Sequence, residues 1–244
     1  MKILAIDTAT EACSVALCYP LSEPELASSV SANDMNVDGI FEICPQQHSQ
    51  QILPMIDTLL NKHKLSLSDL DAIAYGRGPG SFTGVRIAAS TVQGLALGAN
   101  LAVIEVSTLA TMAQEVYEIS GETDIVALID ARMQEVYIGQ YRAKDGLVEE
   151  LIKEDVLSPE RALEVCLAGS KSAGAAGTGF GAYADLFAPY LQNRKVGVKY
   201  PNAKYMLGIA RSMLAAGKVV ASEAIKPVYV RDTVTWKKLP GKSA

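Results

Sequence analysis

The sequence predicts a duplicated α/β architecture, in which each half opens with a hairpin of strands and continues with alternating helices and strands. Three observations lead to this prediction. An apolar run that ends in aspartate, followed by an alternating strand, occurs at 2–17 and again at 124–141. Helical and strand patterns then alternate, as is typical of α/β folds. The chain is 49% hydrophobic and only 6% aromatic. Its length of 244 residues is enough for one large domain or two small ones.

The first half is expected to place two buried strands around a short loop and then to alternate. A helix is expected to begin with Ser49 as its cap and to bend at Pro54. The segment 33–39 is interpreted as a mobile loop. The expected elements are strands at 2–6, 12–17, 26–31, 71–75 and 101–106, and helices at 49–62, 82–98 and 108–117.

The second half repeats the opening hairpin and ends on a long helix. Ser158 followed by Pro159 is a strong helix start, because proline at the first helical position has no amide to leave unpaired. The expected elements are strands at 124–129, 135–141, 147–156, 172–178 and 195–198, helices at 159–167 and 202–217, and an extended piece at 226–230.

Composition limits the partners and the compartment. A net charge of -5 is a poor basis for gripping nucleic acid unaided, because phosphate contacts need clustered Lys and Arg. Cys13, Cys18, Cys44 and Cys166 form no CxxC pair and are interpreted as free buried thiols in a reducing cytoplasm. We expect neither a signal peptide nor a membrane span, since the apolar runs are too short.

The most informative segment is 75–86, with the sequence YGRGPGSFTGVR. Four glycines in nine residues indicate a tight turn and a close approach of something to the backbone. Ser81 or Thr83 can cap the helix that follows, and such a helix start can hold an anion. A loop built only for capping and close packing is the alternative, and a lone glycine-rich loop is weak evidence for phosphate.

The opening hairpin resembles the phosphate-facing element of the actin-like, Hsp70-like (ASKHA) superfamily, a duplicated ribonuclease-H-like fold with two lobes. The matching loop of the second half runs from Asp130 to Met133, where the superfamily's ATP-binding members have small residues; Arg132 and Met133 depart from that pattern. The resemblance therefore implies vestigial nucleotide or phosphate loops. Their candidate residues are Asp7, Thr8, Thr10, Asp130, Arg132, Gly177 and Gly179.

Five segments together resemble the bacterial TsaB family, also called YeaZ: 3–15, 78–86, 94–97, 130–132 and 227–231. This resemblance covers about residues 1–231. It implies a role in forming threonylcarbamoyladenosine (t6A) at position 37 of tRNA, with the catalytic paralogue TsaD and the ATPase TsaE. It also implies three parts: an N-terminal lobe of 1–106 with about 203–231 that carries the interface helices, a second lobe of 107–202, and a flexible tail of 232–244.

The same resemblance implies a chain without catalytic residues of its own. TsaD relatives carry a His-x-x-x-His pair that holds a metal, and Thr108 and Met112 stand at those positions here. The two histidines, His48 and His63, are interpreted as a cap-region residue and a partner of a helix C-terminus. We expect no metal and no tightly bound cofactor; a nucleotide at a subunit boundary stays an open alternative.

An independent enzyme is the rival interpretation, either an ATP-dependent phosphotransferase or a glycoprotease-like peptidase. It would depend on Asp7, Thr10, Asp130 and Gly177. The two aspartates could form a carboxylate pair across a cleft, or they could simply cap the loops that follow them. No histidine is tied by the sequence to a candidate nucleophile, as a serine peptidase would require.

Helix packing supplies the last prediction. The helix at 82–98 is rich in small residues, which let another helix come close. An ordinary internal helix pair explains this equally well, but the family resemblance favours pairing with TsaD, and with a second copy when TsaD is absent; a simple self-associating structural protein is a third possibility. The predicted interface residues are Leu53, Ile56, Leu60, Gly84, Ala88, Thr91, Gly94, Leu95 and Gly98.

Overall fold

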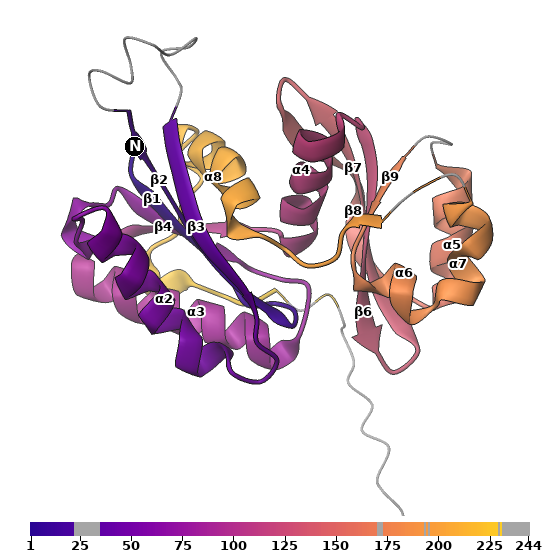
Figure 1. Ribbon diagram of the computed structural model, residues 1–244, viewed down its shortest axis with the longest axis horizontal. Helices are drawn as coiled ribbons and strands as arrows, with labels where there is room; N and C mark the ends of the chain where they lie inside the picture. The colour runs from indigo at the N-terminus through magenta and orange to yellow at the C-terminus, as the bar shows by residue number, and fades with distance from the viewer. Residues whose placement is uncertain (22–34, 170–172, 193, 195, 229, 231–244) are drawn as a thin grey trace, which may run out of the picture.

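A computed structural model describes residues 1–21, 35–169, 173–192, 194, 196–228 and 230. It consists of two lobes, each built on one five-stranded mixed sheet (Figure 1). The first sheet has the order β3-β2-β1-β4-β5 and the second β10-β9-β6-β7-β8. In both, an antiparallel meander of three strands continues into two parallel strands. The duplication predicted from the sequence is therefore confirmed.

Most of the strands lie where the hydrophobic runs predicted them. Those of the first sheet are β1 (Ile3–Asp7), β2 (Ala12–Pro20), β3 (Met35–Ile43), β4 (Ala72–Gly76) and β5 (Ala102–Val106). Those of the second sheet are β6 (Asp124–Arg132), β7 (Glu135–Lys144), β8 (Leu147–Leu157), β9 (Gly174–Ala176) and β10 (Val196–Val198).

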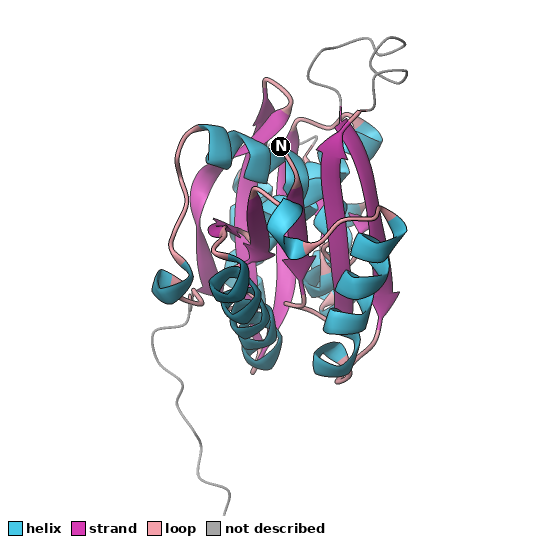
Figure 2. Ribbon diagram, turned by 90° about the vertical axis from the view of Figure 1, so that its left-hand side faces the viewer, coloured by secondary structure: helices cyan, strands magenta, loops and turns pink. Residues whose placement is uncertain are grey.

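Helices cover both faces of each sheet, and Figure 2 shows helices stacked in front of the strands. The first lobe has α2 (His48–Lys62) and α3 (Phe82–Ala99) on one face and α8 (Met206–Ala215) on the other. The second lobe has α4 (Thr108–Ser120) on one face, and α5 (Pro159–Ala168) and α7 (Ala184–Leu191), next to the short α6 (Thr178–Ala182), on the other. Three 3₁₀ turns complete the described elements: η1 (Leu67–Asp69), η2 (Ala203–Tyr205) and η3 (Ser222–Ala224).

Local sequence explains where the main helices begin. Ser81 caps α3 by accepting a hydrogen bond from the amide of Gly84, and Ser158 caps α5 in the same way, with Pro159 at the first helical position. The Ser158 cap was predicted, and Ser81 was one of two predicted candidates, the other being Thr83. Ser49 as the cap of α2 was wrong: the helix begins at His48, and its N-cap residue Gln47 makes no side-chain cap hydrogen bond.

The mobile loop predicted at 33–39 was also wrong where the structure describes it, because β3 occupies Met35–Ile43. Gly39, which suggested a loop, stands where β3 approaches β2 closely: a Cβ atom there would lie 2.7 Å from the carbonyl oxygen of Val15. The polar Asp38 is bound by His63 and Lys62 at the end of α2, so it suits an edge strand. The strand expected at 26–31 and the tail at 232–244 lie outside the described residues.

The lobes meet where the chain passes from β5 into α4 and from β10 into η2. Figure 1 shows α4 and α8 facing each other between the two sheets, and the two helices are in contact. The long helix predicted at 202–217 is η2 followed by α8, which packs on the first sheet. The lobe boundaries at 106, 202 and 231 stay a prediction. None of the described helices has both the length and the apolar character that a membrane span requires.

Candidate functional site

The glycine-rich segment after β4 packs directly on the loop that follows β1. A Cβ atom on Gly84 would lie 2.0 Å from the carbonyl oxygen of Thr8, and one on Gly80 would lie 2.3 Å from that of Ala9. The amide of Ser81 donates a hydrogen bond of 2.7 Å to the same Ala9 carbonyl. Because no side chain fits at these positions, close packing of the chain on itself is a sufficient reason for the glycines.

Asp7, at the end of β1, is buried beneath this contact. Its carboxylate accepts hydrogen bonds from the amide of Ala9 at 2.8 Å and from the hydroxyl of Thr108 at 3.0 Å. A Cβ atom on Gly76 would lie 1.9 Å from its Oδ2. Burial raises the pKa of Asp7 to about 6, since lost hydration disfavours the ionised form more than the two hydrogen bonds favour it.

This raised pKa predicts a pH-dependent cost in stability. Between pH 4 and pH 6 the folded protein holds the Asp7 proton more tightly than the unfolded chain, so the Asp7 contribution to the free energy of unfolding falls as pH rises. A shift from 3.8 to about 6 corresponds to about 3 kcal/mol at most. Asp7→Asn removes this titration and keeps the shape of the side chain.

The expected result is that Asp7→Asn gains stability relative to the unaltered protein as pH rises from 4 to 7. Urea unfolding of both proteins at each pH measures the difference, in which the remaining titrating groups cancel. A stability difference that does not change with pH would contradict the assignment.

The two threonines of the same loop also point their hydroxyls at the protein's own backbone. Thr8 donates a hydrogen bond of 2.7 Å to the carbonyl of Gly84. The Thr10 hydroxyl accepts one of 3.4 Å from the amide of Ala12. Both side chains are buried. The loop predicted as a phosphate-facing element is thus engaged in internal contacts.

The second-half loop pairs its charges locally and across the lobes. Asp130 accepts a hydrogen bond from the amide of Arg132 at 3.0 Å and pairs with its guanidinium at 3.1 Å. Arg132 also reaches Glu11 of the first lobe at 3.2 Å. The Asp130 amide donates to the hydroxyl of Thr178 at 3.1 Å. Of the two roles expected for Asp130, a carboxylate pair across a cleft or a cap of the loop that follows, these contacts correspond to the cap.

The glycines predicted as an adenosine-side loop lie against β6. Gly177 has a φ of +114°, which favours glycine, and a Cβ atom there would lie 2.0 Å from the carbonyl oxygen of Leu128. A Cβ atom on Gly179 would lie 2.8 Å from Leu128 Cγ. Glycines thus permit close packing in the second lobe as well, but against β6 itself rather than against the loop that follows the first strand of the hairpin.

A cleft of about 440 Å³ separates the two loops. The polar and charged side chains around it include Thr10, Glu11, Asp130, Arg132 and Thr178. Two carboxylates face one guanidinium, which both of them already bind. Of the seven candidate phosphate residues, Thr10, Asp130 and Arg132 line the cleft, whereas Asp7, Thr8, Gly177 and Gly179 do not.

Thr108 and Met112, the two positions that the family resemblance matched to a metal-binding histidine pair, are used for packing here. Thr108 and Met112 are both buried in α4, and the Thr108 hydroxyl is engaged by Asp7. His48 opens α2, and His63 follows its last turn, 2.7 Å from Asp38. Within the described ranges, no group of three or more His, Cys, Asp or Glu could hold a metal ion.

The exposed side of α2 and α3, here called the α2/α3 face, consists of Leu53, Phe82, Arg86, Gly94 and Leu97. Leu53, Phe82 and Leu97 are each more than half exposed, and the Arg86 guanidinium lies 3.7 Å from the centre of the Phe82 ring. A Cβ atom on Gly94 would meet nothing within 4 Å. Leu53, Phe82 and Leu97 thus expose apolar area on this face, and Gly94 leaves open space there.

The nine predicted interface residues differ in exposure, and only Leu53 and Gly94 belong to the α2/α3 face. Leu53, Gly94 and Gly98 are exposed, and Thr91 and Leu95 are partly buried. Ile56, Leu60 and Ala88 belong to the core of the first lobe, and Gly84 packs on Thr8, so these four offer no exposed side chain. Phe82 and Leu97 were missed, although Leu97 follows Gly94 by three residues, the spacing of one helix face.

This chain is similar in sequence and in structure to known proteins. The family model of TsaD, tRNA N6-adenosine threonylcarbamoyltransferase, matches residues 27–236. The TsaB protein of Escherichia coli is 49% identical over 99% of this chain and 100% of its own length, and that of Haemophilus influenzae is 40% identical over 99% and 98%. The structure of YeaZ from Pseudomonas aeruginosa is 39% identical over 93% of this chain and all of its own, with a TM-score of 0.76.

These findings define first a class: two-lobed, duplicated α/β proteins of the actin-like fold that are related to TsaD. Within that class the relatives carry the TsaB and YeaZ names across nearly the full length of the chain. The chain belongs to the TsaB (YeaZ) family, as the motifs of its sequence indicated.

Proposed function

We propose that this chain is a non-catalytic subunit in the formation of t6A at adenosine 37 of tRNA. Its relatives in Escherichia coli and Haemophilus influenzae are named tRNA threonylcarbamoyladenosine biosynthesis proteins. The observation that carries the proposal is the burial of Thr108 and Met112 in α4, at the positions where the resemblance to TsaD relatives implies metal-binding histidines. Neither side chain replaces imidazole as a metal ligand, which supports a non-catalytic role.

The partner in this proposal is the catalytic paralogue TsaD, bound through the α2/α3 face, with the ATPase TsaE joining the complex. Small residues at the centre of α3 allow a partner helix to approach, while Leu53, Phe82 and Leu97 supply apolar area. A second copy of the chain would use the same face when TsaD is absent. tRNA would be held mainly by the partners, since the net charge is -5.

A reconstituted modification assay tests the proposal. TsaD, TsaE, tRNA, ATP and a source of threonylcarbamoyl-adenylate are combined with and without this chain, and t6A is measured in the digested tRNA. The expected result is t6A only when the chain is present, and no product from the chain alone. Equal t6A formation without the chain would reject the proposal.

The independent enzyme remains a second candidate, favoured by the raised pKa of Asp7, which suits a general base. Its complete burial and its two hydrogen bonds argue against that use. Calorimetry of the isolated chain with ATP and magnesium separates the candidates. Micromolar binding together with turnover would favour the phosphotransferase.

A further inference from the structure

The edge strand β8 buries a glutamate and exposes one of its leucines and its isoleucine. Leu151 and Ile152 are 47% and 51% exposed, whereas Glu154 is 8% exposed and is the one residue of the strand that is fully buried. Strands normally place apolar residues inward and charges outward. The register of β8 is therefore set by something other than apolar burial.

A bulge between β7 and β8 turns Glu154 inward. The pairing of the two strands shifts around Gln140, which lies opposite Ile152, while Tyr141 lies opposite Glu150. The amide of Glu154 donates to the Glu150 side chain at 3.0 Å. Bulges characteristically redirect a side chain, so this one serves to bring a carboxylate to the boundary between the lobes.

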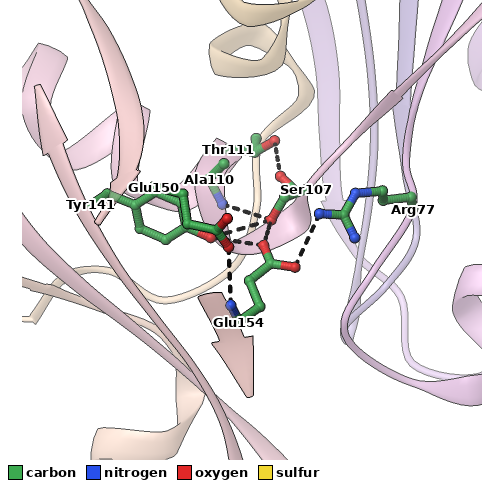
Figure 3. Close-up of polar contacts among 7 residues, drawn as sticks. All are labelled: Arg77, Ser107, Ala110, Thr111, Tyr141, Glu150 and Glu154. Atoms are coloured by element: carbon green, nitrogen blue, oxygen red, sulfur yellow. Dashed lines mark hydrogen bonds and ion pairs between the residues drawn. The ribbon is translucent and has the colours of Figure 1, made fainter. Parts of the chain in front are cut away.

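The Glu154 carboxylate contacts three residues at the boundary between the lobes, as Figure 3 shows. Its Oε2 lies 3.1 Å from Arg77 Nη2 of the first lobe. Its Oε1 accepts hydrogen bonds from the hydroxyl of Tyr141 at 2.8 Å and from that of Ser107. Ser107 also caps α4 by accepting from the amide of Ala110 at 3.1 Å. The carboxylate thus joins the end of β4, the start of α4 and the second sheet.

Arg77 is fixed on its own side. Its amide donates to the Val106 carbonyl at 2.8 Å, and its carbonyl accepts from the amide of Val228 at 3.2 Å. A different interlobe ion pair, Arg132 with Glu11, is mostly exposed to solvent and contributes little, because solvent screens it. In the Arg77–Glu154 pair, by contrast, the glutamate side chain is only 5% exposed and the arginine side chain 25%.

A buried ion pair seldom adds more stability than apolar residues of the same volume would, since both charges lose hydration. Such a pair instead favours one arrangement of the two elements that carry it, because only that arrangement brings the charges together. We propose that Arg77 and Glu154 form an interlobe latch that sets the angle between the lobes. When the latch is released, the lobes rotate about the two chain crossings, 106–108 and 198–203.

Distance measurements between spin labels test the latch. Ser68→Cys in the first lobe and Ala188→Cys in the second introduce exposed labelling sites, while the four native cysteines are buried. Arg77→Met is expected to broaden the interlobe distance distribution and to lengthen its mean. Arg132→Met, which removes the exposed interlobe pair, is the matched control and is expected to leave the distribution unchanged.

The double variant Arg77→Met/Glu154→Leu keeps the test valid if the single variant fails to fold. Removing both charges leaves no unpaired carboxylate, and the hydroxyls of Tyr141 and Ser107, which lose their acceptor, lie 3.4 Å apart and can bond to each other. This protein is therefore expected to fold with less loss of stability than the single variant and still to show the broad distribution. A double variant with the narrow original distribution would overturn the latch. Equal broadening by Arg77→Met and Arg132→Met would overturn it as well.

Discussion

Replacing Gly84 by alanine is expected to destabilise the protein by about 3 kcal/mol or more. The new Cβ atom would lie 2.0 Å from the Thr8 carbonyl oxygen, and the obstacle is backbone rather than the flexible end of a side chain. Either α3 moves away from the β1 loop or the loop breaks its contacts, including the hydrogen bond from the Thr8 hydroxyl to the Gly84 carbonyl. Urea unfolding measures the loss.

Gly98→Ala on the same helix is the matched control. A Cβ atom at Gly98 meets nothing within 4 Å, and alanine is a better helix former than glycine by about 1 kcal/mol. This variant is therefore expected to be equal to or more stable than the unaltered protein. If both alanine variants changed stability alike, the close contact at Gly84 would not be the reason for its glycine.

Gly94→Arg is expected to weaken the proposed binding to TsaD by more than about tenfold, or about 1.4 kcal/mol. Gly94 belongs to the α2/α3 face, where an arginine side chain would occupy the space that a partner helix needs. The isolated chain should fold normally, because the same position has no neighbour within 4 Å. Pull-down and calorimetry with TsaD measure the loss.

Gly181→Arg provides the control for that experiment. Gly181 is exposed in α6 of the second lobe and also has nothing within 4 Å of a Cβ atom, so the chemical change is the same on a surface outside the α2/α3 face. It is expected to bind TsaD as the unaltered chain does. Undiminished binding by Gly94→Arg would exclude the α2/α3 face as the interface.

Local signals in the sequence predicted the elements whose causes are local. The Ser158-Pro159 pair and the Ser81 cap set the starts of α5 and α3, and apolar runs located both hairpins. By contrast, β3 was mistaken for a loop because Gly39 and Asp38 have long-range reasons for their places. The helices α6 and α7 were missed because glycines and Pro189 conceal the helical pattern.

In the candidate site, too, features with local causes could be predicted from the sequence and features with long-range causes could not. The glycines of the segment after β4 indicated a close approach, but only the fold identifies the approaching group as Thr8, which is 76 residues away. The burial of Ile56 and Ala88 followed from which side of each helix faces the sheet. Glu154 could not be predicted, since a bulge decides its direction and its cation lies 77 residues away.

The paired glycine contacts, Gly84 on Thr8 and Gly177 on Leu128, also bear on how such chains are recognised. Each contact is demanded by the architecture of its lobe whether or not any substrate is turned over. A search that infers enzymatic activity from these glycines would therefore assign it to working enzymes and inactive paralogues alike. Activity has to be inferred instead from positions such as Thr108 and Met112, where the chemistry of the side chain rather than the absence of one makes the difference.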